Sequence, residues 1–95
     1  MLTSIESLPA VLAERLQSRR LELGWSRATL AARAAVAPET LRAFERTGQI
    51  SLARLVRLAV ALGVDDELER LFIAPPAPKS LDDVLAQGKR RQRGR

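Results

Sequence analysis

Leucine and alanine recur along the first 73 residues at spacings of three and four, which places them on one side of successive helices. The first helix is expected from Ser7 to Leu23, with Ser7 as a candidate N-cap and Gly24 as the residue that stops it. Its apolar stripe consists of Leu8, Leu12, Leu16 and Leu23. The pattern predicts that this stripe faces a core.

Four shorter helices are predicted downstream, each after a residue that favours a helix start or stop. Their expected spans are 27–34, 38–47, 52–62 and 65–72. The apolar positions that they contribute are Leu30, Ala31, Ala34, Leu41, Phe44, Leu52, Leu55, Val56, Ala59 and Leu62. We therefore expect an all-α fold in which five short helices close one core.

The chain changes character after residue 73, where three prolines occur within four residues. Proline cannot continue a helix, so we assign residues 1–73 to one helical domain and residues 74–79 to a proline-rich linker. In residues 80–95 a Ser-x-x-Asp capping box predicts a short C-terminal helix, followed by a basic tail that we expect to be disordered. The apolar face of this helix consists of Leu81, Val84 and Leu85. It either folds back on the domain or binds a partner chain.

The net charge of +5 arises from 16 basic and 11 acidic residues. Residues 1–78 carry ten basic and nine acidic side chains, whereas residues 79–95 carry six basic and two acidic ones. Most of the net charge therefore lies in the tail, whose candidate phosphate contacts are Lys89, Arg90, Arg91, Arg93 and Arg95. Such a tail adds attraction to nucleic-acid phosphates that does not depend on base sequence.

The chain contains no cysteine and no histidine, which excludes thiol nucleophiles and the usual Cys and His zinc sites. Histidine is also the commonest general base at neutral pH. No Gly-rich phosphate loop or nucleophile–base pair occurs, so we expect neither an enzyme nor a bound cofactor or metal. No apolar run approaches the roughly 20 residues of a membrane span, so we expect no membrane partner and a cytoplasmic, nucleoid-associated protein.

The second and third expected helices are separated by the three residues 35–37. Two short helices joined by such a turn are typical of a helix-turn-helix, which presents its second helix to the DNA major groove. Small side chains at Ala31 and Ala32 allow the helices to approach each other, and Val36 can fill the turn.

Two charged residues lie on or near apolar stripes of this arrangement. Arg20 lies on or near the apolar stripe of the first helix, and Glu45 lies beside Phe44 on the apolar face of the third helix. A half-buried charge needs a partner, so an Arg20–Glu45 ion pair would join the two helices. Alternatively, both side chains reach solvent on their long stems.

The stretch from Leu12 to Leu62 resembles the phage-repressor-like Cro/XRE helix-turn-helix family. Its matching features are an Arg in the first helix, Leu-Gly-x-Ser before the second, Leu-Ala within it, Val in the turn, Thr-Leu in the third, Glu before Gly, and a Leu-rich fourth helix. The resemblance implies a lambda-repressor-like five-helix fold and a homodimer on a palindromic operator in double-stranded DNA. Candidate dimer contacts are Leu68, Leu71 and Phe72.

The resemblance also implies which side chains face DNA. They are Arg27 in the second helix and Pro38, Glu39, Thr40, Arg42, Ala43 and Arg46 in the third. Arg27 stands where the family usually has Gln, and an arginine there can still bind a phosphate. Arg42 could read a guanine edge, and Thr40 could bind a phosphate or touch a thymine methyl group. Glu39 could accept from cytosine N4 or repel phosphate.

Two positions depart from the family pattern. Ala37 stands where Ser or Thr often caps the third helix, and Thr47 is an additional residue before Gly48. We expect both to affect the angle of the third helix rather than the fold.

A narrower resemblance is to HipB-like antitoxins, the repressor partners of HipA-type kinase toxins. It rests on the string Phe44-Glu-Arg-Thr-Gly-Gln-Ile-Ser51 and on Ser80-Leu-Asp-Asp-x-Leu before a basic C-terminus. It implies a repressor that regulates its own operon and binds a HipA-like kinase. The alternative is an interaction adaptor that binds a partner through its C-terminal segment without specific DNA readout.

Overall fold

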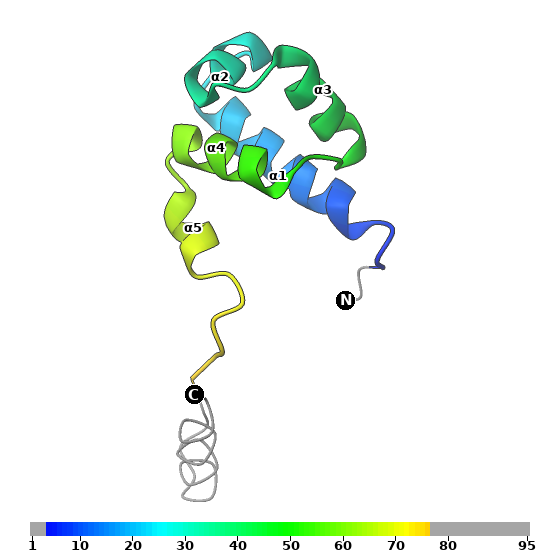
Figure 1. Cartoon of the computed structure of the whole chain (residues 1–95), viewed down its shortest axis with the longest axis vertical. Coiled ribbons are helices and arrows are strands. Elements are labelled where there is room, and N and C mark those ends of the chain that lie inside the picture. The colour runs from blue at the N-terminus through cyan, green and yellow to red at the C-terminus, as the bar shows by residue number, and fades with distance from the viewer. Residues whose placement is uncertain (1–3, 77–95) are drawn as a thin grey trace, which may run out of the picture.

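The computed structural model describes residues 4–76, which form five α-helices and no strand (Figure 1). The helices are α1 Leu8–Glu22, α2 Arg27–Ala34, α3 Pro38–Thr47, α4 Leu52–Leu62 and α5 Asp65–Glu69. In Figure 1, α2 and α3 lie at the top of the view, and α5 extends from the end of α4 away from them. The expected all-α class is confirmed. The predicted C-terminal helix and tail, residues 80–95, lie outside the described residues.

The starts of α2 and α4 are set by short-range capping. The Ser26 hydroxyl accepts a hydrogen bond from the backbone N–H of Thr29 at 3.1 Å. The Ser51 hydroxyl accepts one from the N–H of Arg54 at 3.2 Å. Each bond satisfies an N–H group that a helix leaves without an internal partner.

The two ends of α3 depend on backbone geometry. Ala37 provides no side-chain cap, and Pro38 begins the helix with a residue that has no N–H to satisfy. At the other end Gly48 has φ 82°, and its N–H donates to the carbonyl of Phe44 at 2.7 Å. A Cβ at Gly48 would lie 2.6 Å from the carbonyl carbon of Pro9 in α1. Glycine therefore allows the end of α3 to touch α1.

The core lies where α1, α2, α3 and α4 meet. Its largest fully buried side chains are Leu30, Leu41 and Leu58. Small buried residues, Ala13 of α1, Ala31 of α2 and Ala59 of α4, lie among them. Small side chains at these positions let the helix backbones approach closely.

The expected stripe of α1 is wrong in part. Leu8, Leu12 and Leu23 are exposed, and only Leu16 of the four packs against the core. The residues of α1 that are buried are Ala13 and Arg20, seven positions apart. Since a helix turns about 100° per residue, leucines three and four apart can form a stripe that lies beside the buried one.

The expected stripe of α4 is also wrong in part. Leu52 is 72% exposed and Val56 is exposed, whereas Leu58, outside the predicted stripe, is fully buried. Leucine and valine occur almost all around this helix, so periodicity alone does not distinguish the side that neighbouring helices cover.

The fifth helix is shorter than expected, because it ends at Glu69 rather than at Phe72. The backbone then turns, with the N–H of Leu71 donating to the carbonyl of Leu68 at 3.0 Å. Phe72 has φ 67°, which lies outside the helical region. The candidate dimer contacts therefore divide: Leu68 packs against the core, whereas Leu71 and Phe72 are exposed.

Candidate nucleic-acid interface

A tight turn joins α2 to α3. Ala35 adopts a left-handed conformation with φ 55°, and the N–H of Val36 donates to the carbonyl of Ala31 at 3.0 Å. Val36 and Ala31 are both buried, so the Val36 side chain fills the turn and packs into the core. The arrangement is that of a helix-turn-helix.

The structure brings Arg20 of α1 and Glu45 of α3 together. Arg20 donates from Nε to Glu45 Oε2 at 2.8 Å and from Nη2 to Oε1 at 3.1 Å. Its Nη1 donates to the carbonyl of Trp25 at 2.8 Å. The two side chains are only 6% and 4% exposed, so neither reaches solvent. A bidentate pair of this kind fixes the distance and the angle between α1 and α3.

Arg27 makes a second bond to the same carboxylate. Its Nε donates to Glu45 Oε1 at 2.7 Å, while its side chain remains 49% exposed. From the sequence, Arg27 is expected to contact DNA, and no partner within the protein is predicted for it. Its bond to Glu45 is not anticipated there, because residues 18 positions apart meet only through the tertiary fold. Glu45 therefore joins α1, α2 and α3.

The outer face of α3 carries most of the other residues expected to face DNA. Leu41 and Phe44 are buried, whereas Pro38, Glu39, Arg42 and Arg46 are exposed, and Thr40 and Ala43 are partly buried. Glu39 and Arg42 lie 3.6 Å apart in an exposed pair along the helix. The face is polar and opposite the core, which is how a helix that enters a DNA groove must lie.

Comparison with known families decides what kind of helix-turn-helix this is. A family model described as "Helix-turn-helix", of the Cro/C1 type, matches residues 16–68. The chain belongs to this XRE family of helix-turn-helix proteins. The match extends from the middle of α1 into α5 and therefore includes α2, the turn, α3 and both residues of the Arg20–Glu45 pair. Among curated proteins, none matches the sequence significantly.

Membership in the XRE family supports a DNA-binding transcriptional regulator. Within this family fold, the additional residue Thr47 has a local role. Its hydroxyl donates to the carbonyl of Ala43 at 2.7 Å and accepts from the N–H of Gln49 at 3.1 Å. These bonds satisfy backbone groups at the end of α3, so the departure from the family pattern is accommodated there.

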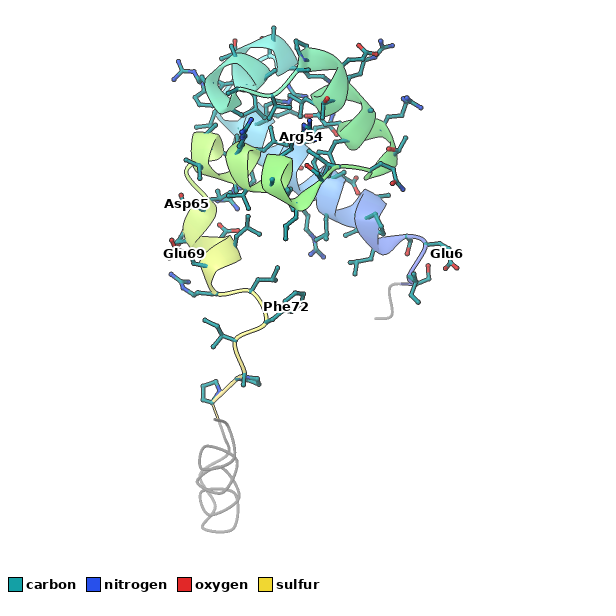
Figure 2. All side chains as sticks on the ribbon, in the orientation of Figure 1. Glu6, Arg54, Asp65, Glu69 and Phe72 are labelled. Carbon is teal, nitrogen blue, oxygen red and sulfur yellow. The ribbon has the colours of Figure 1, made fainter. Side chains whose placement is uncertain are left out.

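Charge is divided unevenly over this XRE domain. Residues 27–62, from α2 to α4, carry six arginines and two glutamates, a net charge of +4. Residues 63–76 carry four acidic residues and one arginine, a net charge of −3. Figure 2 shows Asp65 and Glu69 on α5, away from α2 and α3. The nearly neutral domain is therefore basic where DNA is expected and acidic at its other end.

Three exposed arginines of α2 and α4 were not among the predicted site residues. Arg57 of α4 donates from Nη1 to the carbonyl of Ala35 at 3.1 Å, and the guanidinium of Arg33 lies 4.5 Å from the centre of the Trp25 ring. Arg54, labelled in Figure 2, lies in the first turn of α4 and donates to the Ser51 hydroxyl at 3.3 Å.

The remaining expectations concern other kinds of site. Within residues 4–76 there is no group of three acidic, His or Cys side chains arranged to hold a metal ion. No helix in that range has both the length and the apolar character needed to cross a membrane. The tail contacts expected from Lys89 onward, and the apolar face of Leu81, Val84 and Leu85, lie outside the described residues.

Proposed function

We propose that the protein is a transcriptional repressor that reads a specific DNA sequence through α3. The observation that supports this most is the polar outer face of α3, held rigidly to α1 by the buried Arg20–Glu45 pair. Arg42 would read a guanine edge, and Arg46 would bind a phosphate or a second base. Glu39, released from Arg42, would accept a hydrogen bond from cytosine N4.

A single copy of the protein contacts too few base pairs to recognise a specific operator. The α3 helix has ten residues, of which only one face can reach base edges, so it covers a few base pairs. Two copies related by a twofold axis would bind half-sites about one helical turn apart. We therefore propose a homodimer on a palindromic operator.

Selection from a random pool of duplex DNA, together with the DNA upstream of the gene, tests sequence-specific binding. The double substitution Arg42→Ala, Arg46→Ala should weaken binding to the selected duplex by roughly 30-fold or more, because it removes two contacts and each specific contact is worth about 1–3 kcal/mol. Its matched control is Arg15→Ala, Arg70→Ala, which removes the same charge from α1 and from the end of α5. Fluorescence anisotropy measures both variants.

Equal losses of affinity in the two double variants would mean that the protein binds DNA through its net positive charge and not through base contacts from α3. An unchanged affinity in the α3 variant, with the same sequences selected, would show that α3 is not the reading helix.

We further propose that the repressor is the antitoxin of a HipA-like kinase and controls its own operon. Large apolar side chains that stay 42–94% exposed support a protein partner. They include Leu8 and Leu12 of α1, Leu52, Val56 and Val60 of α4, and Leu71, Phe72 and Ile73 after α5. The segment 80–95 adds Leu81, Val84 and Leu85.

Co-purification with a kinase-like protein encoded beside the gene tests the antitoxin role. A chain truncated after Pro78 should lose the kinase if residues 80–95 bind it, and should keep its operator preference while its binding becomes weaker and less dependent on salt. If the full chain binds the kinase but selects no DNA sequence, the interaction adaptor is the correct function.

A further inference from the structure

The carboxylate of Glu45 is shared by two arginines that it holds in different ways. Oε2 accepts from Arg20 Nε, and Oε1 accepts both from Arg20 Nη2 and from Arg27 Nε. One negative charge thus lies against two positive charges, in a site where the carboxylate itself is only 4% exposed. Arg27 is the arginine that faces solvent, so it presents the positive charge that Glu45 does not neutralise.

Arg20 is too deeply buried to reach a ligand. It donates from Nε and Nη2 to Glu45 and from Nη1 to Trp25, and its side chain is almost fully buried. Its role is to join α1 to α3.

Arg27 differs from Arg20 in both respects. Its side chain is about half exposed, and its hydrogen bond within residues 4–76 is the one from Nε to Glu45. A guanidinium is a planar fork, so anchoring it at Nε leaves Nη1 and Nη2 at the outer end. Two parallel N–H groups of this kind match the oxygen atoms of a phosphate.

We propose that Glu45 is a positioning residue for DNA binding, because it aims the two outer amino groups of Arg27 at one DNA phosphate beside α2. This rests on the proposed function, since it requires α3 to lie in the groove. The same carboxylate then sets both the position of α3 and the direction of the phosphate contact from α2. The position of the phosphate contact from α2 is thereby fixed relative to the base contacts from α3.

Lysine at position 27 distinguishes aiming from simple charge. Arg27→Lys keeps the positive charge, but a single ammonium group cannot hold Glu45 through one end and clamp a phosphate with the other. We expect this variant to bind the selected duplex nearly as weakly as Arg27→Ala does. Arg15→Lys, at an exposed arginine of α1 outside the candidate interface, is the matched control and should bind as the unchanged chain does.

Neutral phosphates locate the contact. In copies of the selected duplex, one phosphate per half-site is replaced in turn by an uncharged methylphosphonate, and the full chain is titrated with each. The unchanged chain should lose about tenfold in affinity at the phosphate that Arg27 clamps. Arg27→Ala should show no loss at that position and keep the losses elsewhere, and its salt slope should fall by about 0.9.

Glu45→Gln tests the positioning step, with circular dichroism as the check on folding. The loss at the Arg27 phosphate should shrink in this variant more than the losses at other phosphates. Should Glu45→Gln not fold, Arg27→Lys decides, because Arg27 is half exposed and is not part of the core.

Several results overturn the proposal. Wild-type affinity of Arg27→Lys would show that Arg27 acts as a point charge, and the absence of any phosphate whose effect depends on Arg27 would show that Arg27 does not touch DNA. In both cases sequence-specific binding would stand. If the chain selects no DNA sequence at all, the proposed function fails and this inference fails with it.

Discussion

Arg19 and Arg20 are neighbours in α1, yet they tie this helix to two regions by different kinds of ion pair. Arg20 binds Glu45 of α3 with both side chains buried, whereas Arg19 binds Glu67 of α5 at 2.9 Å with both side chains substantially exposed. An exposed pair contributes about 0–1 kcal/mol, but a buried charge that loses its partner costs several. The Arg20 pair thus fastens the helix-turn-helix to α1, while the Arg19 pair adds little to the attachment of α5, which rests on apolar contacts such as that of Leu68.

The surfaces of the two regions differ in the same sense. The helix-turn-helix region is basic, and two of its charged groups, Arg27 and Glu45, are held by hydrogen bonds. The region around α5 is acidic and ends in Phe72, which is 94% exposed. Regions with few buried contacts open and rearrange most easily. The contrast teaches that the charged groups at one end of the domain are held in place by buried contacts, whereas the backbone at the other end is freer to adjust.

The largest test of this contrast removes the carboxylate from each pair. Glu45→Ala should lower the free energy of unfolding by about 3–5 kcal/mol, because the buried charge of Arg20 loses its carboxylate and keeps only the Trp25 carbonyl. Glu67→Ala should lower it by about 1 kcal/mol or less. Urea unfolding followed by circular dichroism measures both, and a total stability of roughly 5–15 kcal/mol for a small domain makes the first variant marginal.

Similar losses in the two glutamate variants would show that α5 is as firmly attached as α3. The difference should persist in high salt, since salt screens the exposed pair and leaves the buried one nearly unaffected.

A second pair of variants compares the glycines that end α3 and α4. Gly48→Ala should cost more than about 2 kcal/mol, because φ 82° is unfavourable for alanine and the new Cβ would lie 2.6 Å from Pro9. Gly63, which leads to α5, has a similar φ of 76°, but a Cβ added there would meet no atom within 4 Å. Gly63→Ala should therefore cost only about 1 kcal/mol. Thermal unfolding distinguishes the two variants. Equal losses of stability would mean that α1 shifts to make room for the new Cβ at the end of α3.

Local signals in the sequence predicted the helix boundaries of the tightly held region. Ser26, Pro38, Gly48, Ser51 and Gly63 all act within a turn of their own position, so no knowledge of the tertiary fold is needed to interpret them. The same reasoning failed after Glu69, where the spacing of apolar residues continues but the backbone turns. Few contacts hold that segment to its neighbours.

Long-range features of the site were only partly predictable. The pairing of Arg20 with Glu45 could be suggested, because a charge on an apolar stripe demands a partner. The contact from Arg27 could not, since an arginine at the start of a helix shows no such conflict with its surroundings. The exposed Leu8 and Leu52 were missed for a related reason: leucine recurs on two sides of α1 and α4, and the covered side depends on where the other helices lie.

The smallest test concerns the two residues other than glycine that have positive φ within residues 4–76. Ala35 lies in the turn between α2 and α3 at φ 55°, and Phe72 lies beyond α5 at φ 67°. Ala35→Gly should raise the free energy of unfolding by about 0.5–1 kcal/mol, because the left-handed conformation costs alanine about 1–2 kcal/mol and glycine loses part of that gain through its greater freedom when unfolded. Phe72→Gly should leave stability unchanged within about 0.5 kcal/mol, since the exposed segment after α5 can relax its own backbone. A gain at both positions, measured as the shift in thermal midpoint, would show that the segment after α5 is held as rigidly as the turn.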